Sequence, residues 1–285
     1  MNSKSHEEPG VENGVKCRKD DVTVSGGLAQ SIKQIREGLL GLENWSQGFN
    51  DLTAIPARWV IHRCEAGVFL LDMESMIDRA IRKTDSWESA QIKTLTRLIK
   101  QHYSTNYDLV FLDIGAYLGW YSMVMLRSGL FSELHAFEAN PENYAQLNAN
   151  ILLNSALKSI HLHPNVVTDR TGETQISLPL RRSNRGWAEV SETAGFNADF
   201  HVPNLVLDQL FAGVSDKFFV AKIDVEGHEE HVLEGMRKLF ESNMFLLQVE
   251  AYSRNEKRIH EKLKGAGFEF IESIREDHFF FKAQA

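Results

Sequence analysis

The chain has 285 residues, 43% of them hydrophobic, and a formal net charge of −8. This length and composition allow a large buried core, and the acidic balance argues against a surface that binds nucleic acid or anionic lipid over the whole molecule. Two cysteines, Cys17 and Cys64, exclude a disulfide framework.

The N-terminal part of the chain is predicted to be an extension. Residues 1–27 have no apolar stretch typical of a leader peptide and no periodicity, so we expect a disordered tail. Residues 28–85 are expected to form an accessory amphipathic helix over 28–42 and a hairpin over 58–71. No apolar run reaches the roughly 18 residues of a membrane span, so we expect a cytoplasmic protein with no membrane partner.

The main domain is expected over residues 86–285. It begins with a helix that ends near His102, and Asp85 and Glu88 are predicted to cap it. From there apolar runs and helical patterns alternate, which is typical of a parallel sheet with helices on both faces. The predicted strands are 109–112, 133–138, 160–167, 218–223, 245–249 and a closing hairpin of 268–271 and 278–281. The predicted helices begin at Trp120 and Asn140, run through 232–240, and include Ile259 and Leu263.

The segment LVFLDIGAYLGWYSMVM, residues 109–125, predicts a strand, a glycine turn and a helix. Gly115 and Gly119 permit positive φ angles and a close approach of backbone N–H groups to a ligand. Ligands of open α/β sheets bind there, outside the carboxyl end of the first strand. The turn lacks GxGxxG, and Asp113 beside it would repel a pyrophosphate but attract a sulfonium group. The turn therefore favours S-adenosylmethionine over NAD.

Acidic residues end four of the predicted strands: Asp113, Glu138, Asp224 and Glu250. Because the carboxyl ends of parallel strands lie along one edge of the sheet, we expect these side chains to converge on one crevice. Glu138 lies some twenty residues beyond the glycine turn, where a carboxylate accepts hydrogen bonds from both ribose hydroxyls of a nucleoside cofactor. Each carboxylate could instead cap the following helix or complement its dipole.

Four segments carry a resemblance to a known family: DIGAYLGWYS, HAFEANPENYAQLNANILLN, NVVTDRTGE and KIDVEGHEEHVLEG. In this order and spacing they resemble the FkbM family of S-adenosylmethionine-dependent methyltransferases, over roughly residues 86–252. The resemblance implies a Rossmann-like α/β fold with a mostly parallel seven-stranded sheet, an antiparallel last strand and helices on both faces. It also implies transfer of the cofactor methyl group, usually to a hydroxyl of a sugar or small natural product.

The resemblance places the cofactor turn at Asp113, Gly115 and Gly119, and the ribose-binding carboxylate at Glu138. Tyr117, at the tip of the turn, stands where the family commonly has Asn, so we expect altered contacts near the methionine end of the cofactor.

The resemblance concerns three further positions. Ala139 stands where the family commonly has Pro. Trp87 and Glu88 form a pair that is frequent in the family, and we expect them either to cover the cofactor or, for Glu88, to cap the helix.

The candidate catalytic residues are Asp224, Glu226 and His228, at the junction of the fourth strand with its helix. Methyl transfer to oxygen needs a near in-line approach and a group that accepts the hydroxyl proton. Asp224 is the first candidate for this base and His228 the second, although His228 could equally be a packing histidine. Lys222, on the same strand face as Asp224, is expected to pair with a carboxylate.

The sequence offers two other candidate sites. Asp224 and Glu250 could bind Mg²⁺, since carboxylates on adjacent strand ends form a hard-oxygen site, but a site without metal is favoured. The spacing HEEH supplies no third ligand and argues against zinc there. A basic and aromatic cluster, which either binds a phosphorylated or carboxylated acceptor or is a solvated loop, comprises Arg181, Arg182, Arg185 and Trp187.

The sequence thus predicts an S-adenosylmethionine-dependent O-methyltransferase whose acceptor is a sugar, glycan or small natural product. A nucleic-acid ribose 2′-O-methyltransferase would need a basic groove, which the net charge supports poorly. A noncatalytic cofactor-binding subunit would keep Asp113 and Glu138 but tolerate loss of Asp224, and a nicotinamide oxidoreductase would bind NAD. The sequence specifies no oligomeric state.

Overall fold

The computed structural model describes residues 58–103, 106–177, 189–190 and 200–284. The chain divides into two compact units, Met1–Pro56 and Ala57–Ala285, and the described residues belong to the second. The predicted tail, the predicted helix over 28–42 and the cluster from Arg181 to Trp187 lie outside the described residues. The division at residue 86 stays a prediction.

Strands and helices alternate from β3 to β5, and longer runs of one type flank this part. In chain order the described elements are β1 (Trp59–Cys64), β2 (Gly67–Asp72), α2 (Met76–Thr84), α3 (Ser89–His102), β3 (Asp108–Ile114), α4 (Trp120–Ser128), β4 (Glu133–Phe137), α5 (Pro141–Leu153), β5 (His161–His163), β6 (Val166–Val167), β7 (Glu173–Ser177), β8 (Glu189–Val190), β9 (Phe200–Leu205), α6 (Leu207–Leu210), β10 (Lys217–Ile223), α7 (Glu229–Glu234), α8 (Arg237–Ser242), β11 (Met244–Glu250), α9 (Glu256–Gly265), β12 (Glu269–Ile274) and β13 (Asp277–Lys282). In the part of the chain that is described, no helix is long and apolar enough to cross a bilayer.

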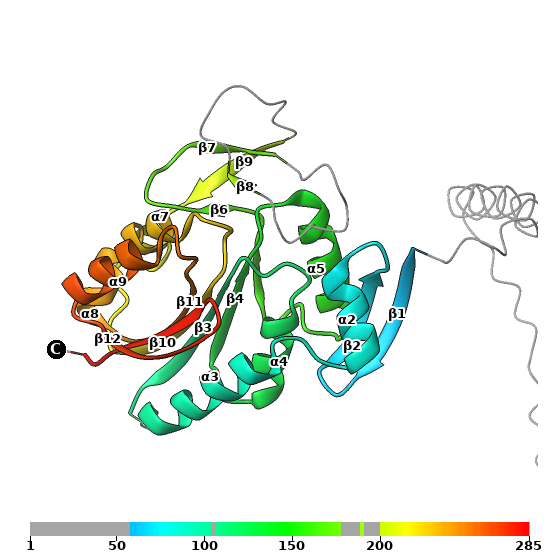
Figure 1. Cartoon of the computed structure of the whole chain (residues 1–285), viewed down its shortest axis with the longest axis horizontal. Helices are drawn as coiled ribbons and strands as arrows, with labels where there is room; N and C mark the ends of the chain where they lie inside the picture. Colours follow the sequence, from blue (N-terminus) through cyan, green and yellow to red (C-terminus); the bar gives the residue numbers. More distant parts are fainter. Residues whose placement is uncertain (1–57, 104–105, 178–188, 191–199, 285) are drawn as a thin grey trace, which may run out of the picture. The chain divides into compact units, whose positions relative to one another are not determined.

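A seven-stranded sheet in the order β12-β13-β11-β10-β3-β4-β5 forms the centre of this unit (Figure 1). The strands from β11 to β5 pair in parallel, whereas β13 runs antiparallel to both β11 and β12. A short turn can join β12 to β13 because only antiparallel neighbours can be linked that way. The predicted α/β fold, with its mostly parallel sheet and antiparallel last strand, is confirmed.

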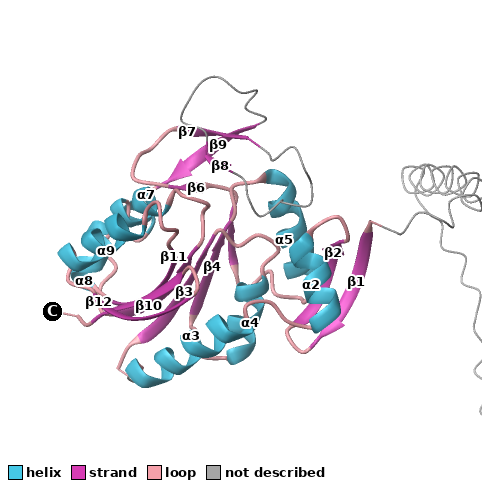
Figure 2. Cartoon of the chain, in the orientation of Figure 1, coloured by secondary structure: helices cyan, strands magenta, loops and turns pink. Residues whose placement is uncertain are grey.

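Helices cover both faces of the sheet, with α3, α4 and α5 on one side and α7, α8 and α9 on the other (Figure 2). Successive residues of β3 point to opposite faces. Phe111 packs in the core cluster that contains Leu95 of α3, and Leu112 packs in the cluster that contains Leu233 of α7. Strands buried on both faces need apolar residues at every position, which explains the unbroken apolar runs in the sequence.

The predicted strand over 160–167 is two strands in the structure. β5 pairs with β4 in the main sheet, but β6 pairs with β9 in a second sheet of order β6-β9-β7-β8. Pro164 lies between β5 and β6 and has no N–H to donate, so it interrupts the ladder of the main sheet.

The continuous helix predicted over 232–240 is wrong, because α7 and α8 are separate helices that meet at Gly235. The carbonyl of Gly235 accepts a hydrogen bond from the backbone N–H of Asp208, 2.8 Å away. The Asp208 carboxylate then accepts from the N–H groups of Lys238 and Leu239, at 3.1 and 2.9 Å, and so caps the start of α8.

The predicted hairpin is confirmed as β1 and β2, but the helix that follows it, α2, was not predicted. Ser75 caps α2 by accepting from the N–H of Asp78, a pattern that could have been recognised in the sequence. Asp85 is the C-cap of α2 with a φ of 55°, and Glu88 makes no side-chain cap hydrogen bond to α3. The predicted capping box of Asp85 and Glu88 is therefore wrong.

Polar side chains of α5 complete the open edge of β2. Asn154 accepts from the N–H of Val68 at 2.9 Å, and Asn150 accepts from the N–H of Leu70 at 2.6 Å. The strand edge is thereby satisfied within the chain rather than exposed. The hairpin and α2 are in this way attached to the helix that follows β4.

Candidate functional site

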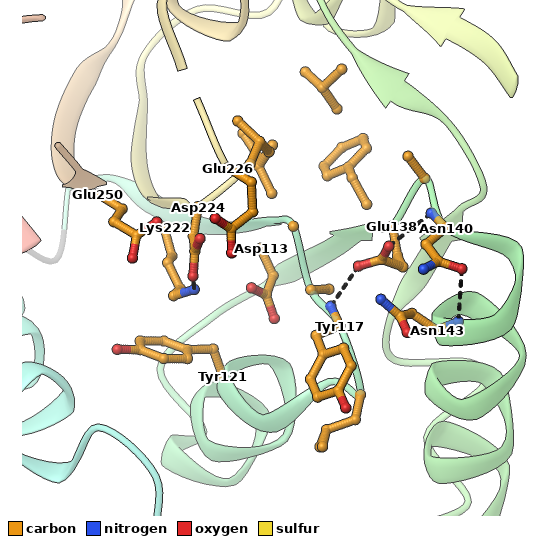
Figure 3. A pocket seen from close by; sticks show the side chains of 18 of the residues that line it. Asp113, Tyr117, Tyr121, Glu138, Asn140, Asn143, Lys222, Asp224, Glu226 and Glu250 are labelled. Atoms are coloured by element: carbon orange, nitrogen blue, oxygen red, sulfur yellow. Dashed lines mark hydrogen bonds and ion pairs between the residues drawn. The ribbon is translucent and has the colours of Figure 1, made fainter. Parts of the chain in front are cut away.

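A pocket lies at the carboxyl ends of β3, β4, β10 and β11. Of the predicted site residues, those that line it are Asp113, Gly115, Tyr117, Glu138, Asp224, Glu226, His228 and Glu250. Figure 3 shows Glu138 on one side of this pocket, the group of Asp224, Glu226 and Glu250 on the other, and Asp113 between them. The structure therefore brings together the four carboxylates that end the strands. Among the predicted site residues that the structure describes, Gly119 alone does not line the pocket.

Close packing against protein atoms explains both glycines of the turn. Gly115 has a φ of +84°, and a Cβ there would lie 1.8 Å from the carbonyl oxygen of Asp224. Gly119 has a φ of +87°, and its Cβ would lie 2.6 Å from Cδ1 of Leu147 in α5. The positive φ expected at Gly119 is confirmed, its missing Cβ makes room for a helix, and the approach of a ligand there stays a prediction.

Asp113 holds the start of α4. Its Oδ2 accepts hydrogen bonds from the N–H and the hydroxyl of Ser122, at 2.9 and 2.6 Å. Burial raises the pKa of Asp113, and the nearby Lys222 ammonium opposes that effect. The side chain therefore positions the turn and the helix as well as lining the pocket.

Glu138 fastens the glycine turn to the start of α5. Its Oε2 accepts from the N–H of Tyr117 and its Oε1 from the N–H of Asn140, both at 2.8 Å (Figure 3). The Asn143 side chain also hydrogen-bonds to it, yet burial raises the pKa of Glu138 to about 7. A carboxylate has about four acceptor positions, so these three donors leave capacity for one hydrogen bond from a ligand.

Tyr117 joins the turn to α2. Its hydroxyl donates to Oδ1 of Asp78 at 2.7 Å and lies 2.8 Å from Oγ of Ser75. Its φ is 51°, a conformation that is uncommon for a residue other than glycine. Through this contact Ile77 of α2 reaches the pocket wall, which the sequence did not indicate.

Lys222 and Asp224 form an ion pair beneath the pocket, with Nζ 2.7 Å from Oδ2. Burial alone would lower the pKa of Lys222, but the carboxylates of Asp224 and Glu88 outweigh it and keep that pKa well above its usual value. Burial likewise opposes the charge on Asp224, and Lys222 outweighs it so that the pKa of Asp224 is lowered. The prediction that Lys222 pairs with a carboxylate is confirmed.

Two more carboxyl groups share this end of the pocket. One oxygen from each of Asp224, Glu226 and Glu250 lies within 4.8 Å of the others. Burial and then the charge of Asp224 raise the pKa of Glu226 to about 8 and that of Glu250 to about 10. Tyr252 donates its hydroxyl to Oε1 of Glu250 at 2.9 Å. At neutral pH, Glu226 and Glu250 are therefore mainly protonated, and Asp224 carries the charge that Lys222 offsets.

His228 is the N-cap residue of α7 and is 5% exposed. Its Nε2 lies 3.1 Å from Oγ1 of Thr168, and its ring stacks on that of His231. These contacts fix the ring at the pocket wall, as a packed and hydrogen-bonded histidine.

The polar pocket residues that sequence reasoning missed include Tyr121, Asn143 and Tyr252. Tyr121 donates to Oε2 of Glu88 at 2.8 Å, and Lys222 lies over its ring. Asn143 and Tyr252 contact Glu138 and Glu250, respectively. The positions of Tyr121 and Asn143 in the first turns of α4 and α5, beside the pocket, were a usable signal. Trp87 and Glu88, expected near the cofactor, also line the pocket.

A family model described as the methyltransferase FkbM domain matches residues 113–272, more than half of the chain. The fold is similar to that of a methyltransferase FkbM from Methylobacillus flagellatus KT, at 15% identity and a TM-score of 0.43, over 63% of this chain and 44% of that one. The chain thus spans less than half of that protein's length.

Two further solved structures are similar. Precorrin-6y C5,15-methyltransferase from Geobacter metallireducens GS-15 matches at 14% identity and a TM-score of 0.41, over 70% of this chain and 90% of that one. TYW2 from M. jannaschii, solved in complex with AdoMet, matches at 14% identity and a TM-score of 0.37, over 79% and 84%. No curated protein matches the chain.

Proposed function

The chain belongs to the FkbM methyltransferase family, and from this premise we propose that it transfers the methyl group of S-adenosylmethionine to a hydroxyl of a sugar, glycan or small natural product. The observation that carries the proposal is a single pocket with Glu138, held by two backbone N–H groups, on one side and the Lys222–Asp224 pair on the other. In this proposal the nucleoside of the cofactor binds at the Glu138 end of the pocket, and methyl transfer takes place at the Lys222–Asp224 end.

The residues present fit S-adenosylmethionine. Glu138 has acceptor capacity for a ribose hydroxyl, and the carboxyl oxygens of Asp113, Asp224 and Glu226 give the pocket acceptor atoms that a sulfonium group would contact favourably. When bound, the cofactor supplies an electrophilic methyl group. Tyr117 and Gly115 would line its binding site through the turn that Glu138 fixes.

Of the three candidates, we assign the role of the base to Glu226. An acceptor hydroxyl must lose one proton during methylation, and a base works best when its pKa lies near the operating pH. The pKa of Glu226 is about 8, whereas Lys222 lowers that of Asp224 and so weakens it as a base. His228 is engaged with Thr168. In this assignment Glu226 takes the proton, and Asp224 orients the hydroxyl.

The charge of the pocket supports an uncharged acceptor. Among the described residues that line it, Lys222 is the sole Lys or Arg side chain, whereas the carboxyl groups are those of Glu88, Asp113, Glu138, Asp224, Glu226 and Glu250. A polyanion such as RNA would find one cationic side chain among these residues, Lys222, and that side chain is already paired with Asp224. This disfavours the alternative of a ribose 2′-O-methyltransferase.

Calorimetry on the full chain with S-adenosylhomocysteine and with NAD tests the cofactor. We expect binding of S-adenosylhomocysteine and none of NAD, and failure of S-adenosylhomocysteine to bind would contradict the proposal. Transfer of labelled methyl groups to a panel of sugars, polyketides and RNA then tests the acceptor class. A noncatalytic subunit would bind S-adenosylhomocysteine but methylate none of these acceptors. In that case the Asp224→Asn substitution would leave the affinity for S-adenosylhomocysteine unchanged.

A further inference from the structure

Four polar residues outside the pocket gather on β4 and β5, at one edge of the main sheet. Glu133 and His135 lie two residues apart on β4, and His161 and His163 lie two residues apart on β5. The register places His135 opposite His161 and Phe137 opposite His163. Because side chains alternate between the faces of a strand, all four polar residues project from the same face of the sheet.

His135 is held through both of its ring nitrogens. Its Nε2 lies 3.0 Å from Oε1 of Glu133, and its Nδ1 lies 3.0 Å from Nε2 of His163. The ring of His161 stacks on it, with the ring centroids 4.7 Å apart. One donor atom from each of Glu133, His135 and His161 lies within 4.8 Å of the other two.

We propose that Glu133, His135 and His161 bind a divalent transition-metal ion of the zinc class. Two imidazoles and one carboxylate are a ligand set that zinc takes in proteins, whereas Mg²⁺ prefers oxygen ligands. Three protein ligands leave a fourth tetrahedral position for water. His163 would hold the second nitrogen of His135 and fix the orientation of that ring, as partners behind metal-bound histidines do.

The surroundings fix one ligand and leave two able to adjust. His135 is 6% exposed, and the ring of Phe211 packs edge-on against it, with the centroids 5.0 Å apart. His161 is exposed, and the Glu133 side chain is 43% exposed. Both can therefore close on an ion from solvent. A second cavity, lined in part by Glu133, His135 and Phe211, lies beside them.

A bound ion would link the edge strand to its neighbour. β5 pairs with β4 over three residues, from His161 to His163, so this junction has few hydrogen bonds. β4 also leads into Glu138, three residues after His135. An ion at this position would stabilise the strand that carries Glu138, at a site separate from the pocket.

A second group of ligand-type residues provides an internal control. One donor atom each of Glu256, His260 and His278 also lies within 4.8 Å of the others. There Nε2 of His260 and Nδ1 of His278 hydrogen-bond to each other at 2.8 Å, so an ion would have to displace that bond. At β4 and β5 an ion would displace the bond between Glu133 and His135, but His163 would still hold the second nitrogen of His135, so the proposal assigns the tighter site there.

The test titrates the chelator-treated full chain with Zn²⁺ by calorimetry and follows its melting temperature. We expect one tight equivalent, a rise in melting temperature, and a visible absorption band of four-coordinate cobalt when Co²⁺ replaces zinc. His161→Ala alters an exposed side chain and should fold, weaken binding at least about tenfold and abolish the cobalt band. Glu133→Gln should also weaken binding.

His260→Ala is the matched control and should keep the tight equivalent. Three results would overturn the proposal. They are no zinc binding by the unaltered chain, a zinc affinity in both His161→Ala and Glu133→Gln that equals that of the unaltered chain, or loss of the tight equivalent only in His260→Ala. All three readouts are independent of methyl transfer, so failure of this site leaves the proposed function intact.

Discussion

The backbone N–H of Tyr117 donates a hydrogen bond to Oε2 of Glu138 across 2.8 Å, and this bond fixes the turn after β3 to the end of β4. Tyr117 sits in the left-handed region at a φ of 51°, and its hydroxyl is bound to Asp78 at the far end of the side chain. A strained residue persists when its surroundings determine its conformation, and such residues cluster at ligand sites. The turn, α2 and the start of α5 therefore form one wall of the pocket.

Replacing Glu138 by Gln should weaken binding of S-adenosylhomocysteine about 10- to 100-fold, the effect of losing charged hydrogen bonds to the ribose. Because burial raises the pKa of Glu138 to about 7, the affinity of the unaltered protein should increase as the pH rises through 7, and this dependence should vanish in the variant. Calorimetry at several pH values measures both effects. Glu142→Gln, in the first turn of α5, is the control. Equal affinity in Glu138→Gln and the unaltered chain would show that the ribose assignment is wrong.

Tyr117→Phe should lower the free energy of unfolding by about 1–3 kcal/mol, because it removes a hydrogen bond to the buried carboxylate of Asp78. Urea denaturation measures this change. Tyr144→Phe, which deletes a hydroxyl from the half-buried part of α5, is the control and should have a smaller effect. A stability unchanged from that of the unaltered protein would mean that the contact between the turn and α2 contributes nothing.

The rate of methyl transfer should rise with pH through about 8, since Glu226 accepts a proton only in its ionised form and its pKa is about 8. Glu226→Gln should reduce kcat by about 100-fold or more and flatten this rise. Glu230→Gln changes a half-buried carboxylate that pairs with Arg258 and does not line the pocket, so it should keep the profile. If the Glu226→Gln variant keeps the original pH dependence, Glu226 is not the base, and Asp224 and His228 remain as candidates for that role.

Methyl transfer should survive exhaustive EDTA treatment. The group of Asp224, Glu226 and Glu250 has the geometry of a cation site, but Lys222 already offsets the charge of Asp224. The rate per folded molecule, measured before and after chelation, checks this expectation. A loss of activity that Mg²⁺ restores would show that the three carboxylates hold a metal after all.

Gly115→Ala should prevent folding or cost more than about 3 kcal/mol, because its Cβ would meet the carbonyl oxygen of Asp224 at 1.8 Å. Gly129→Ala is the matched comparison. That glycine also has a positive φ, +66°, but nothing lies within 4 Å of its Cβ position, so only the backbone strain of about 1–2 kcal/mol is expected. Similar losses of stability in the two variants would contradict the close approach of β3 and β10.

Local patterns in the sequence determined most of the fold. The apolar runs of β3, β10 and β11 and the Asn140 cap of α5 depend on neighbouring residues, so they could be recognised without tertiary contacts. The same holds for the placement of Asp113, Glu138, Asp224 and Glu250, because parallel strands that end in carboxylates bring them to one edge of the sheet.

Contacts between residues far apart in the sequence decided the rest. Gly119 faces Leu147, Asp208 breaks the helix at Gly235, and the hydroxyl of Tyr117 reaches Asp78, and none of these pairs is adjacent in the chain. The pKa values of the carboxyl groups in the pocket also depend on such contacts. Glu226 has a raised pKa because folding buries it beside the negative charge of Asp224, and Lys222 holds that charge in place. The sequence alone therefore identified which carboxylates meet, and the tertiary structure decided which of them carries a proton.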